Sequence, residues 1–283
     1  VGGTRLRGEV SVVGAKSRAL KLMAGALRAV GQTRLTNVPA ILDVTIMAEL
    51  LRRLGCVVDY DAAAGVVEID VPDQIGHRAD YELVRALRAS ICVLGPLVAR
   101  CGEAQVAIPG GDAIGSRGLD LHISGLETLG ASVHVAHGYL IAAAPKGLRG
   151  GDIRLGFPSV GATENVLMAA VLAKGVTRVT NAAREPEIVD IAKFLTKMGA
   201  SIQGAGSSVI EVEGVSALAP VSHEVVPDRL GAGTRALAAG STRGALAAVG
   251  GRVVQLAAAV AARTRACRTR QQRAEVRRDW GWG

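Results

Sequence analysis

Aromatic residues are scarce in this chain of 283 residues: Phe, Trp and Tyr make up 2% of it, whereas 49% of the residues are hydrophobic. A core must therefore be built from Ala, Val, Leu and Ile. No apolar run approaches the ~20 residues that a membrane-spanning helix needs, so we expect no membrane segment. No apolar stretch follows the charges near the N-terminus, so the sequence predicts no signal peptide and a cytoplasmic protein.

Cysteines are few and are not arranged as metal ligands. Cys56, Cys92, Cys101 and Cys267 include no Cys-x-x-Cys pair, and no cluster of histidines accompanies them. The sequence therefore predicts neither a metal site nor a disulfide framework. Cys92 and Cys101 lie in apolar sequence, and we interpret them as small buried residues.

Lysine is absent after residue 230, where ten arginines and two acidic residues carry the whole formal excess of +8. Residues 1–230 are electrically neutral, so they offer no basic surface of the kind that nucleic-acid binding requires. We expect no nucleic-acid partner. A nucleic-acid binder that acts through the arginine-rich end ranks last among three functional hypotheses.

The chain contains an internal repeat of about seventy residues. Gly55, Gly130 and Gly199 recur with this spacing, and each follows an amphipathic pattern and stands where a helix ends. We predict these helices at 43–54, 119–129 and 187–198. Alternating sequence after each glycine predicts hairpins at 57–69, 132–142 and 201–212.

A second landmark repeats in the same order. Gly31, Gly102 and Gly175 each begin a short strand pattern. The helices expected before these strands, at 15–30, 84–100 and 162–174, are apolar on most sides and should be buried. We predict one α/β domain over residues 1–230, with its repeats between about 10 and 228. Three apolar helices should lie inside, with sheets and amphipathic helices outside. Residues 231–283 are predicted to be a divergent, partly disordered tail.

The segment 109–122 carries a candidate site. Three glycines allow its backbone to approach a ligand closely, and they flank Asp112. Arg117 follows, just before the helical pattern. A loop acid, a cation and a helix N-terminus suit an anionic substrate that must also be protonated. An ordinary glycine-rich turn is the alternative interpretation.

Several further motifs occur in order within the predicted domain. They are Gly14-Ala-Lys16, Arg88-Ala-Ser, Pro109-Gly-Gly-Asp-Ala-Ile-Gly-Ser-Arg117, Asp120-Leu-His-Ile-Ser-Gly-Leu-Glu127, Ser159-Val-Gly-Ala-Thr163, Asn181-Ala-Ala-Arg-Glu-Pro-Glu-Ile-Val-Asp190 and Pro227-Asp-Arg229. With the threefold repeat, they make the chain resemble the enolpyruvyl transferases, most closely those acting on UDP-N-acetylglucosamine. The relatives that act on shikimate 3-phosphate share the fold but match these motifs less well.

The resemblance implies an activity without a cofactor: transfer of enolpyruvyl from phosphoenolpyruvate to UDP-N-acetylglucosamine, with release of phosphate. Lys16 and Arg117 would bind phosphoenolpyruvate, and Asp112 would be the general acid that protonates its methylene carbon. The implied substrate-binding residues are Lys16, Ser17, Arg88, Arg117, Gly118, Leu119, Asp120 and Leu121, with Phe157, Pro158, Ser159 and Val160 at the uridine end. His122 is interpreted as structural, and the charges at 184–190 as a salt-bridged loop and helix start.

The sequence departs from the family at three places. Asp112 stands where most members have Cys, so the chain should resist fosfomycin. Ser17 replaces the usual Asn, and Arg18 should add a charge beside the phosphate site. The resemblance fades at 233–234, before the second domain that completes the family's cleft. We expect a reading-frame change there, or else a genuine tail that binds acidic partners. Little activity is then expected, and the alternative function is a non-catalytic remnant that binds a UDP-sugar.

Overall fold

The computed structural model describes residues 4–108 and 118–249. The chain divides into two compact units, which are described separately. Unit 1 holds residues 1–15 and 226–283, and unit 2 holds residues 16–225. Within the described part, no helix has both the length and the apolar character needed to cross a membrane.

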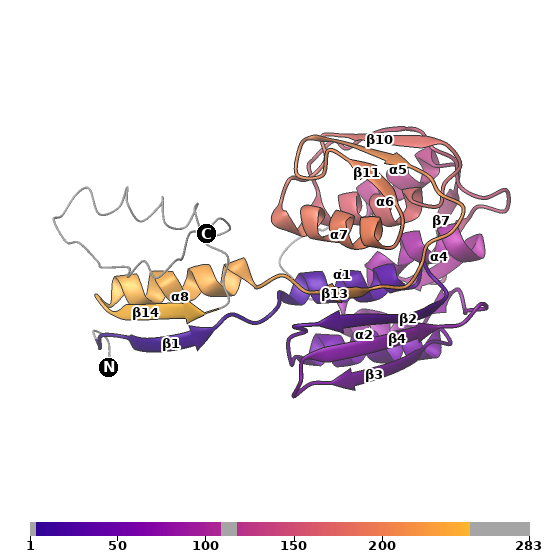
Figure 1. Ribbon diagram of the computed structural model, residues 1–283. Coiled ribbons are helices and arrows are strands. Elements are labelled where there is room, and N and C mark those ends of the chain that lie inside the picture. Colours follow the sequence, from indigo (N-terminus) through magenta and orange to yellow (C-terminus); the bar gives the residue numbers. More distant parts are fainter. Residues whose placement is uncertain (1–3, 109–117, 250–283) are drawn as a thin grey trace. The chain divides into compact units, whose positions relative to one another are not determined.

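Unit 2 contains three four-stranded sheets of one design (Figure 1). In each, the strand predicted after the repeated glycine pairs antiparallel with a hairpin on one side and parallel with a short strand on the other. The orders are β13 (Ser222–Glu224)-β2 (Gly31–Thr36)-β4 (Val66–Val71)-β3 (Val57–Asp61), β5 (Arg78–Ala79)-β6 (Glu103–Ala107)-β8 (Tyr139–Ala143)-β7 (Ser132–Ala136), and β9 (Asp152–Arg154)-β10 (Val176–Thr180)-β12 (Val209–Glu213)-β11 (Ser201–Gln203).

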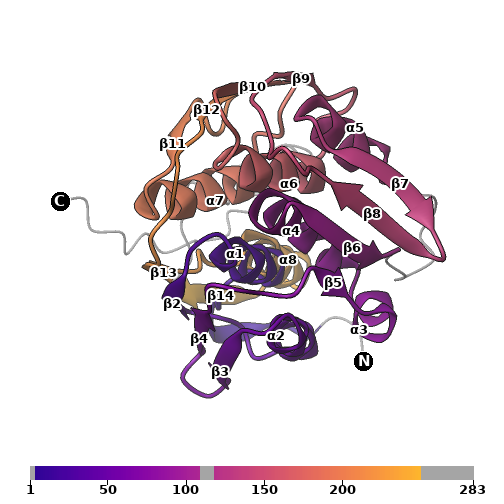
Figure 2. The ribbon, with the colours of Figure 1, turned by 90° about the vertical axis from the view of Figure 1, so that its right-hand side faces the viewer.

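Helices fill the space that the three sheets surround (Figure 2). The most apolar helical segments lie innermost and are buried, and the sheets and the amphipathic helices lie around them, as the repeat predicts. The inner segments are α1 (Lys16–Ala26), η1 (Arg88–Val93) with α4 (Leu94–Cys101), and α6 (Val160–Ala170); the others are α2 (Leu42–Arg53), α3 (Tyr81–Ala86), α5 (Asp120–Thr128) and α7 (Pro186–Lys197).

The repeated glycines end their helices as predicted. Gly55, Gly130 and Gly199 follow α2, α5 and α7 with φ values of +99°, +91° and +110°. A side chain would be strained in this left-handed conformation, whereas glycine adopts it readily. The three predicted hairpins follow at β3–β4, β7–β8 and β11–β12.

The single helix predicted over 84–100 is wrong, because the structure breaks it into α3, η1 and α4. Leu87 has an extended backbone with φ −138° and ψ 104°. Pro96 lies in the first turn of α4, where its missing N–H and its ring are tolerated. One continuous helix would place that ring deep inside the helix, against a carbonyl one turn earlier.

The end of unit 2 completes the sheet that its beginning opened. β9 and β5 each precede the helical segment that leads to their parallel partner, whereas β13 follows β2 only after all the other elements of unit 2. His223 of β13 opposes Leu35 of β2. The third repeat thereby supplies the fourth strand of the first.

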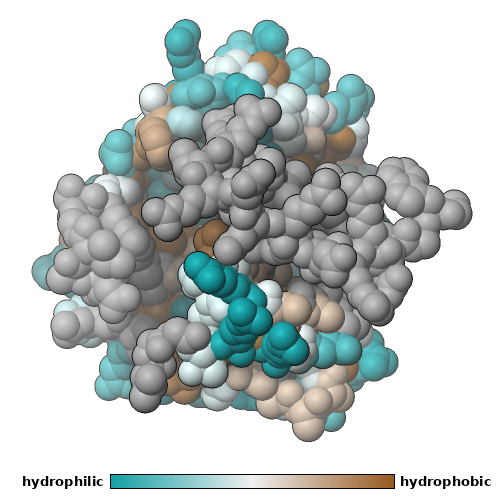
Figure 3. All heavy atoms as spheres, turned by 90° about the vertical axis from the view of Figure 1, so that its left-hand side faces the viewer, coloured by the Kyte–Doolittle hydropathy of each residue, from teal (hydrophilic) through white to brown (hydrophobic). Residues whose placement is uncertain are grey.

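Unit 1 is built from α8 (Arg229–Ser241) and a parallel pair, β1 (Arg7–Ser11) with β14 (Ala245–Val249). Asp228 caps α8, since its Oδ1 accepts a hydrogen bond of 2.9 Å from the Leu230 amide. The expected tail therefore includes α8 and β14, while 250–283 lie outside the described residues. On the face drawn in Figure 3, hydrophilic and moderately apolar residues lie side by side.

Candidate functional site

Lys16 begins α1, and its side chain reaches solvent. The side chain is 58% exposed, and its Nζ lies 2.9 Å from Oδ1 of Asp43, in the first turn of α2. Ser17 follows it and is also exposed. Lys16, which is predicted to bind phosphoenolpyruvate, is thus accessible to solvent, and the Asp43 carboxylate balances its charge.

Arg18 does not add a charge beside Lys16, contrary to expectation. Its side chain is 1% exposed, and its Nη2 lies 3.2 Å from Oε1 of Glu187. Residues two apart on a helix point in different directions, so Lys16 faces solvent while Arg18 faces α7.

For the glycine-rich segment 109–122, the structure describes residues 118–122 and the residues up to 108 that precede it. Asp112 and Arg117 lie outside the described residues, and Arg88 is described only as the backbone residue that opens η1. Gly118 and Leu119 lead into α5, which begins at Asp120 and continues through Leu121. Gly118 and Asp120 are exposed, and the two leucines are half-buried.

The segment predicted for the uridine end leads into α6. Phe157 is 66% exposed, and Pro158 beside it is exposed too. Ser159 is the N-cap of α6: its Oγ accepts a hydrogen bond from the Ala162 amide at 3.3 Å. Val160 is the first residue of the helix. An exposed aromatic ring at a helix start can stack against a planar base.

The first two turns of four motif-bearing helices lie together. Glu187 near the start of α7 contacts Arg18 of α1, and Glu164 of α6 contacts Lys21 of α1. A Cβ on Gly161 of α6 would lie 3.5 Å from the ring of His122, in the first turn of α5. The four motifs, far apart in sequence, therefore begin their helices at one end of unit 2.

The starts of α1 and α6 have the polarity that an anion requires, whereas Asp120 and Glu187 stand in the first turns of α5 and α7. Backbone N–H groups in a first helical turn lack intrahelical partners and carry a partial positive charge. Neither α1 nor α6 has an acidic residue in its first turn, and Lys16 adds a full charge. The arrangement can therefore bind phosphate and carboxylate groups.

Two polar residues of α6, Thr163 and Asn165, form hydrogen bonds that link α6 to neighbouring segments at this end. Asn165 of α6 accepts a hydrogen bond of 2.7 Å from the Gly95 amide, and its Nδ2 lies 3.0 Å from Nδ1 of His122. Thr163 Oγ1 accepts a bond of 3.1 Å from the Ala183 amide. His122 is buried, which agrees with the structural role predicted for it.

The charges at 184–190 divide between solvent and core. Arg184 is exposed. Glu187 pairs with Arg18, and Oδ1 of Asp190 lies 3.1 Å from Nε2 of His223. The predicted salt bridging is confirmed only in part, because Glu187 pairs with Arg18 of α1 rather than with a residue of the segment, and Asp190 contacts His223 of β13.

Burial also governs the titrating groups. It raises the pKa of Glu164 to about 7, although Lys21 opposes the rise. It raises the pKa of the Cys92 thiol to about 12 and that of Cys56 to about 11. Neither thiol is therefore ionised near neutrality, which suits packing rather than nucleophilic chemistry. No group of three His, Cys, Asp or Glu that could hold a metal occurs within residues 4–108 and 118–249.

The sequence reasoning missed Asp43, Lys21, Glu164 and Asn165. For Lys21, Glu164 and Asn165 a signal was available, because all three lie in segments that are otherwise mostly apolar. Buried polar groups of this kind need partners. For Asp43 there was no such signal, since an acidic residue in the first turn of a helix is common.

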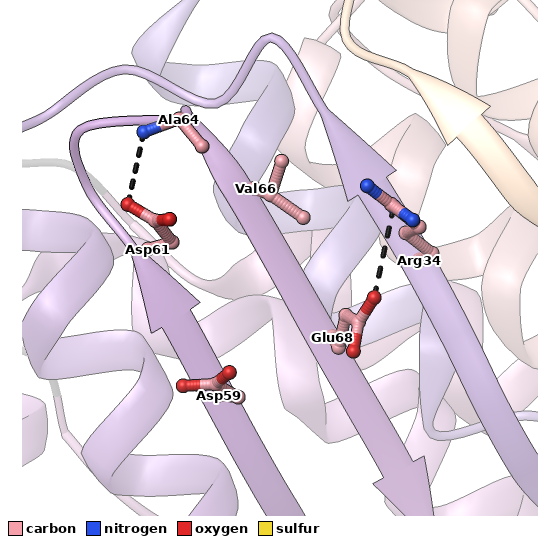
Figure 4. Close-up of a pocket in the computed structure, with 6 residues that line it drawn as sticks. All are labelled: Arg34, Asp59, Asp61, Ala64, Val66 and Glu68. Carbon is pink, nitrogen blue, oxygen red and sulfur yellow. Dashed lines mark hydrogen bonds and ion pairs between the residues drawn. The ribbon is translucent and has the colours of Figure 1, made fainter.

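A hollow of about 210 Å³ lies elsewhere, on the solvent face of the β13-β2-β4-β3 sheet (Figure 4). It is lined by Arg34, Asp59, Asp61, Ala64, Val66 and Glu68. None of these belongs to the motifs, and its carboxylates disfavour an anion. The hollow is separate from the candidate site.

Known proteins resemble the chain in both sequence and fold. The sequence model of the EPSP synthase (3-phosphoshikimate 1-carboxyvinyltransferase) family matches residues 1–266. UDP-N-acetylglucosamine 1-carboxyvinyltransferase of Corynebacterium jeikeium is 60% identical over 243 residues, which are 86% of this chain and 57% of that protein. The enzyme of the same name from Mycolicibacterium paratuberculosis is 54% identical over 249 residues, 88% of this chain and 59% of that protein.

Two solved structures share the fold. The enolpyruvyl transferase NikO from Streptomyces tendae gives a TM-score of 0.72 at 23% identity, covering 83% of this chain and 55% of that one. EPSP synthase from Acinetobacter baumannii gives 0.64 at 19% identity, covering 82% and 52%. The chain thus spans less than three fifths of the curated relatives named above.

Proposed function

The chain belongs to the EPSP synthase family of enolpyruvyl transferases, and we propose on that basis that it takes part in transfer of enolpyruvyl from phosphoenolpyruvate to UDP-N-acetylglucosamine. Phosphate is the second product, and the reaction is the first committed step of peptidoglycan synthesis. The choice of the sugar nucleotide as acceptor is supported by the names of relatives that are 54–60% identical.

The observation that carries the proposal is the convergence of the first two turns of α1, α5, α6 and α7. Phosphoenolpyruvate and a diphosphate both need partial and full positive charge, which helix N-termini and Lys16 supply together. Phe157 to Val160 lead into one of these helices and suit the uridine end, and Gly118 to Leu121 lead into another.

The proposed chemistry is addition followed by elimination. Asp112 gives a proton to the methylene carbon of phosphoenolpyruvate while the sugar hydroxyl attacks the adjacent carbon and releases its own proton to water. The carbon–oxygen bond to phosphate then breaks as the methyl carbon returns a proton to the Asp112 carboxylate, which leaves the enol ether. A carboxylic acid can serve here if its surroundings keep it protonated. Lys16 and Arg117 would hold the phosphate and carboxylate during both steps.

Phosphate release from phosphoenolpyruvate by the purified chain tests the activity, with and without UDP-N-acetylglucosamine. Release that needs the sugar nucleotide and is lost in Asp112→Ala and Lys16→Ala supports the proposal. Lys193→Ala is the matched control, because Lys193 is an exposed helical lysine on α7. Calorimetric titration with UDP-N-acetylglucosamine separates the second hypothesis: binding without phosphate release indicates a sugar-nucleotide binder. If the chain neither binds UDP-N-acetylglucosamine nor releases phosphate, the transferase hypothesis and the binder hypothesis are both refuted.

A further inference from the structure

Two cations lie one turn apart on the buried helix α1. The Arg18 side chain is 1% exposed and that of Lys21 is 14% exposed. Residues three apart lie on the same side of a helix. Arg18 is paired with Glu187 of α7 at 3.2 Å, and Lys21 with Glu164 of α6 at 2.5 Å. One helix is thus tied to two neighbours by two buried ion pairs.

These pairs are poor devices for stability alone. Taking charges out of water costs as much as their mutual attraction returns, and apolar residues of similar size usually hold helices together equally well. Arg18 also leaves Nε and Nη1 without a hydrogen-bond partner among the described residues. The cost suggests that the pairs contribute something other than stability.

Direction and register are what an ion pair supplies and an apolar contact does not. A slide of α1 by one residue moves it by ~1.5 Å along its axis, which an apolar surface tolerates. The same slide would separate Lys21 from Glu164 and, at the same time, Arg18 from Glu187. Because their partners lie on different helices, rotation of α1 is opposed as well.

What the pairs hold in place is the beginning of α1. Lys16 lies two residues before Arg18, and its own side chain is 58% exposed. Among the described residues its one ion pair is with Asp43. Solvent-facing contacts of this kind give little geometric control. The position of its backbone must therefore be set from the buried side of the helix.

We propose that Arg18 and Lys21 are positioning residues: their ion pairs with Glu187 and Glu164 set the register of α1, and with it the place of Lys16 and Ser17 in the anion site. The proposal rests on the proposed function for its meaning. The fixed register of α1 is a physical claim that is measured without a ligand.

The first measurement is amide hydrogen exchange in the whole chain. In α1 the amides of residues 20–23 donate to the carbonyls of residues 16–19, so their exchange reports opening of the first turns. The test variant is Lys21→Met with Glu164→Met, which replaces one pair by apolar side chains of similar length. The control removes an exposed pair, Arg178–Glu211 at 3.6 Å, by two alanine substitutions.

We expect the methionine pair to keep the thermal midpoint within a few degrees, while exchange at residues 20–23 speeds up about tenfold. Affinity for UDP-N-acetylglucosamine and phosphoenolpyruvate should fall by about tenfold or more, since small displacements of a binding group are costly. The reversed pair, Lys21→Glu with Glu164→Lys, should restore part of both. The control should change neither.

Unchanged exchange at residues 20–23 in a folded methionine pair would overturn the proposal. If that variant does not fold, Lys21→Arg with Glu164→Asp is measured instead. It keeps both charges but alters the reach of the bridge, so α1 exchange must change while other helices do not. If the parent chain binds neither ligand, the proposed function fails, and the exchange result still decides whether the pairs set the register.

Discussion

Replacement of Glu164 by glutamine should change how the stability of the chain depends on pH. Glu164 is 1% exposed, and burial raises its pKa from the ordinary 4.5 to about 7. The charges and thiol that act on it are Lys21 of α1, which opposes the rise, and Glu187, Glu185 and Cys92. Glutamine keeps the shape of the carboxylic acid but cannot ionise.

The sign follows from proton binding. The folded protein keeps the Glu164 proton at pH values where the unfolded chain has already released it. The stability associated with this group is therefore complete below pH 4.5 and is lost as the pH rises through about 7. A shift of this size corresponds to about 3 kcal/mol, of which about 2–3 kcal/mol falls between pH 5 and pH 8.

Urea unfolding followed by circular dichroism at a series of pH values measures the effect. The quantity is the free energy of unfolding of Glu164→Gln minus that of the parent, which should rise by about 2–3 kcal/mol between pH 5 and pH 8. The change with pH is the informative quantity, because the absolute level also reflects the loss of the partner of Lys21. Glu211→Gln, at an exposed carboxylate paired with Arg178, should give a flat difference.

A flat or falling difference for Glu164→Gln would refute the reasoning. A flat difference would mean that attraction to Lys21 offsets the desolvation of the carboxylate, and a falling one would mean that attraction exceeds desolvation, so that folding stabilises the ionised form. The buried pair would then contribute to stability near neutral pH, and the argument that it serves register rather than stability would lose its basis.

Two further outcomes are expected. Gly95→Ala should lower the free energy of unfolding by about 2–4 kcal/mol in urea titration, since a Cβ there would collide with the Asn165 backbone and side-chain oxygens. Gly156→Ala, which meets nothing within 4 Å, should change it by less than about 1 kcal/mol, and equal losses would contradict the packing argument. Fosfomycin should leave residue 112 unmodified in intact-mass measurements, because a carboxylate is a much weaker nucleophile than a thiolate. Asp112→Cys should gain the mass of the inhibitor, and an adduct on Asp112 itself would show that the argument from nucleophilicity is wrong.

Much of the fold follows from local rules. The glycines after α2, α5 and α7 end their helices because only glycine enters the left-handed region without strain, and this is legible in one sequence. Alternation in the hairpin predicted at 57–69 places Val67 and Ile69 on the buried face of β4, as period-two patterning predicts, and Val71 continues that face. The break at Leu87 was missed because apolar sequence does not distinguish a continuous helix from three short ones.

The positions of three candidate segments at helix starts were predictable from the sequence, but their contacts with other helices were not. Lys16, Ser159 and the start of α5 lie where their motifs place them, at the N-terminal ends of helices. Arg18 was misjudged because proximity in sequence was taken for proximity in space. On a helix, a displacement of two residues turns a side chain to the other side, so the charge beside Lys16 lies in the core.

The sequence by itself determined the repeat, the types of its elements and the turns between them, because these depend on periodicity and on the conformational freedom of single residues. Only the tertiary structure decided that β13 joins β2, and that four helices present their first two turns together. It also decided that Lys21 of the first repeat meets Glu164 of the third. Such pairings depend on how three similar units pack around one core, and local sequence patterns do not specify that packing.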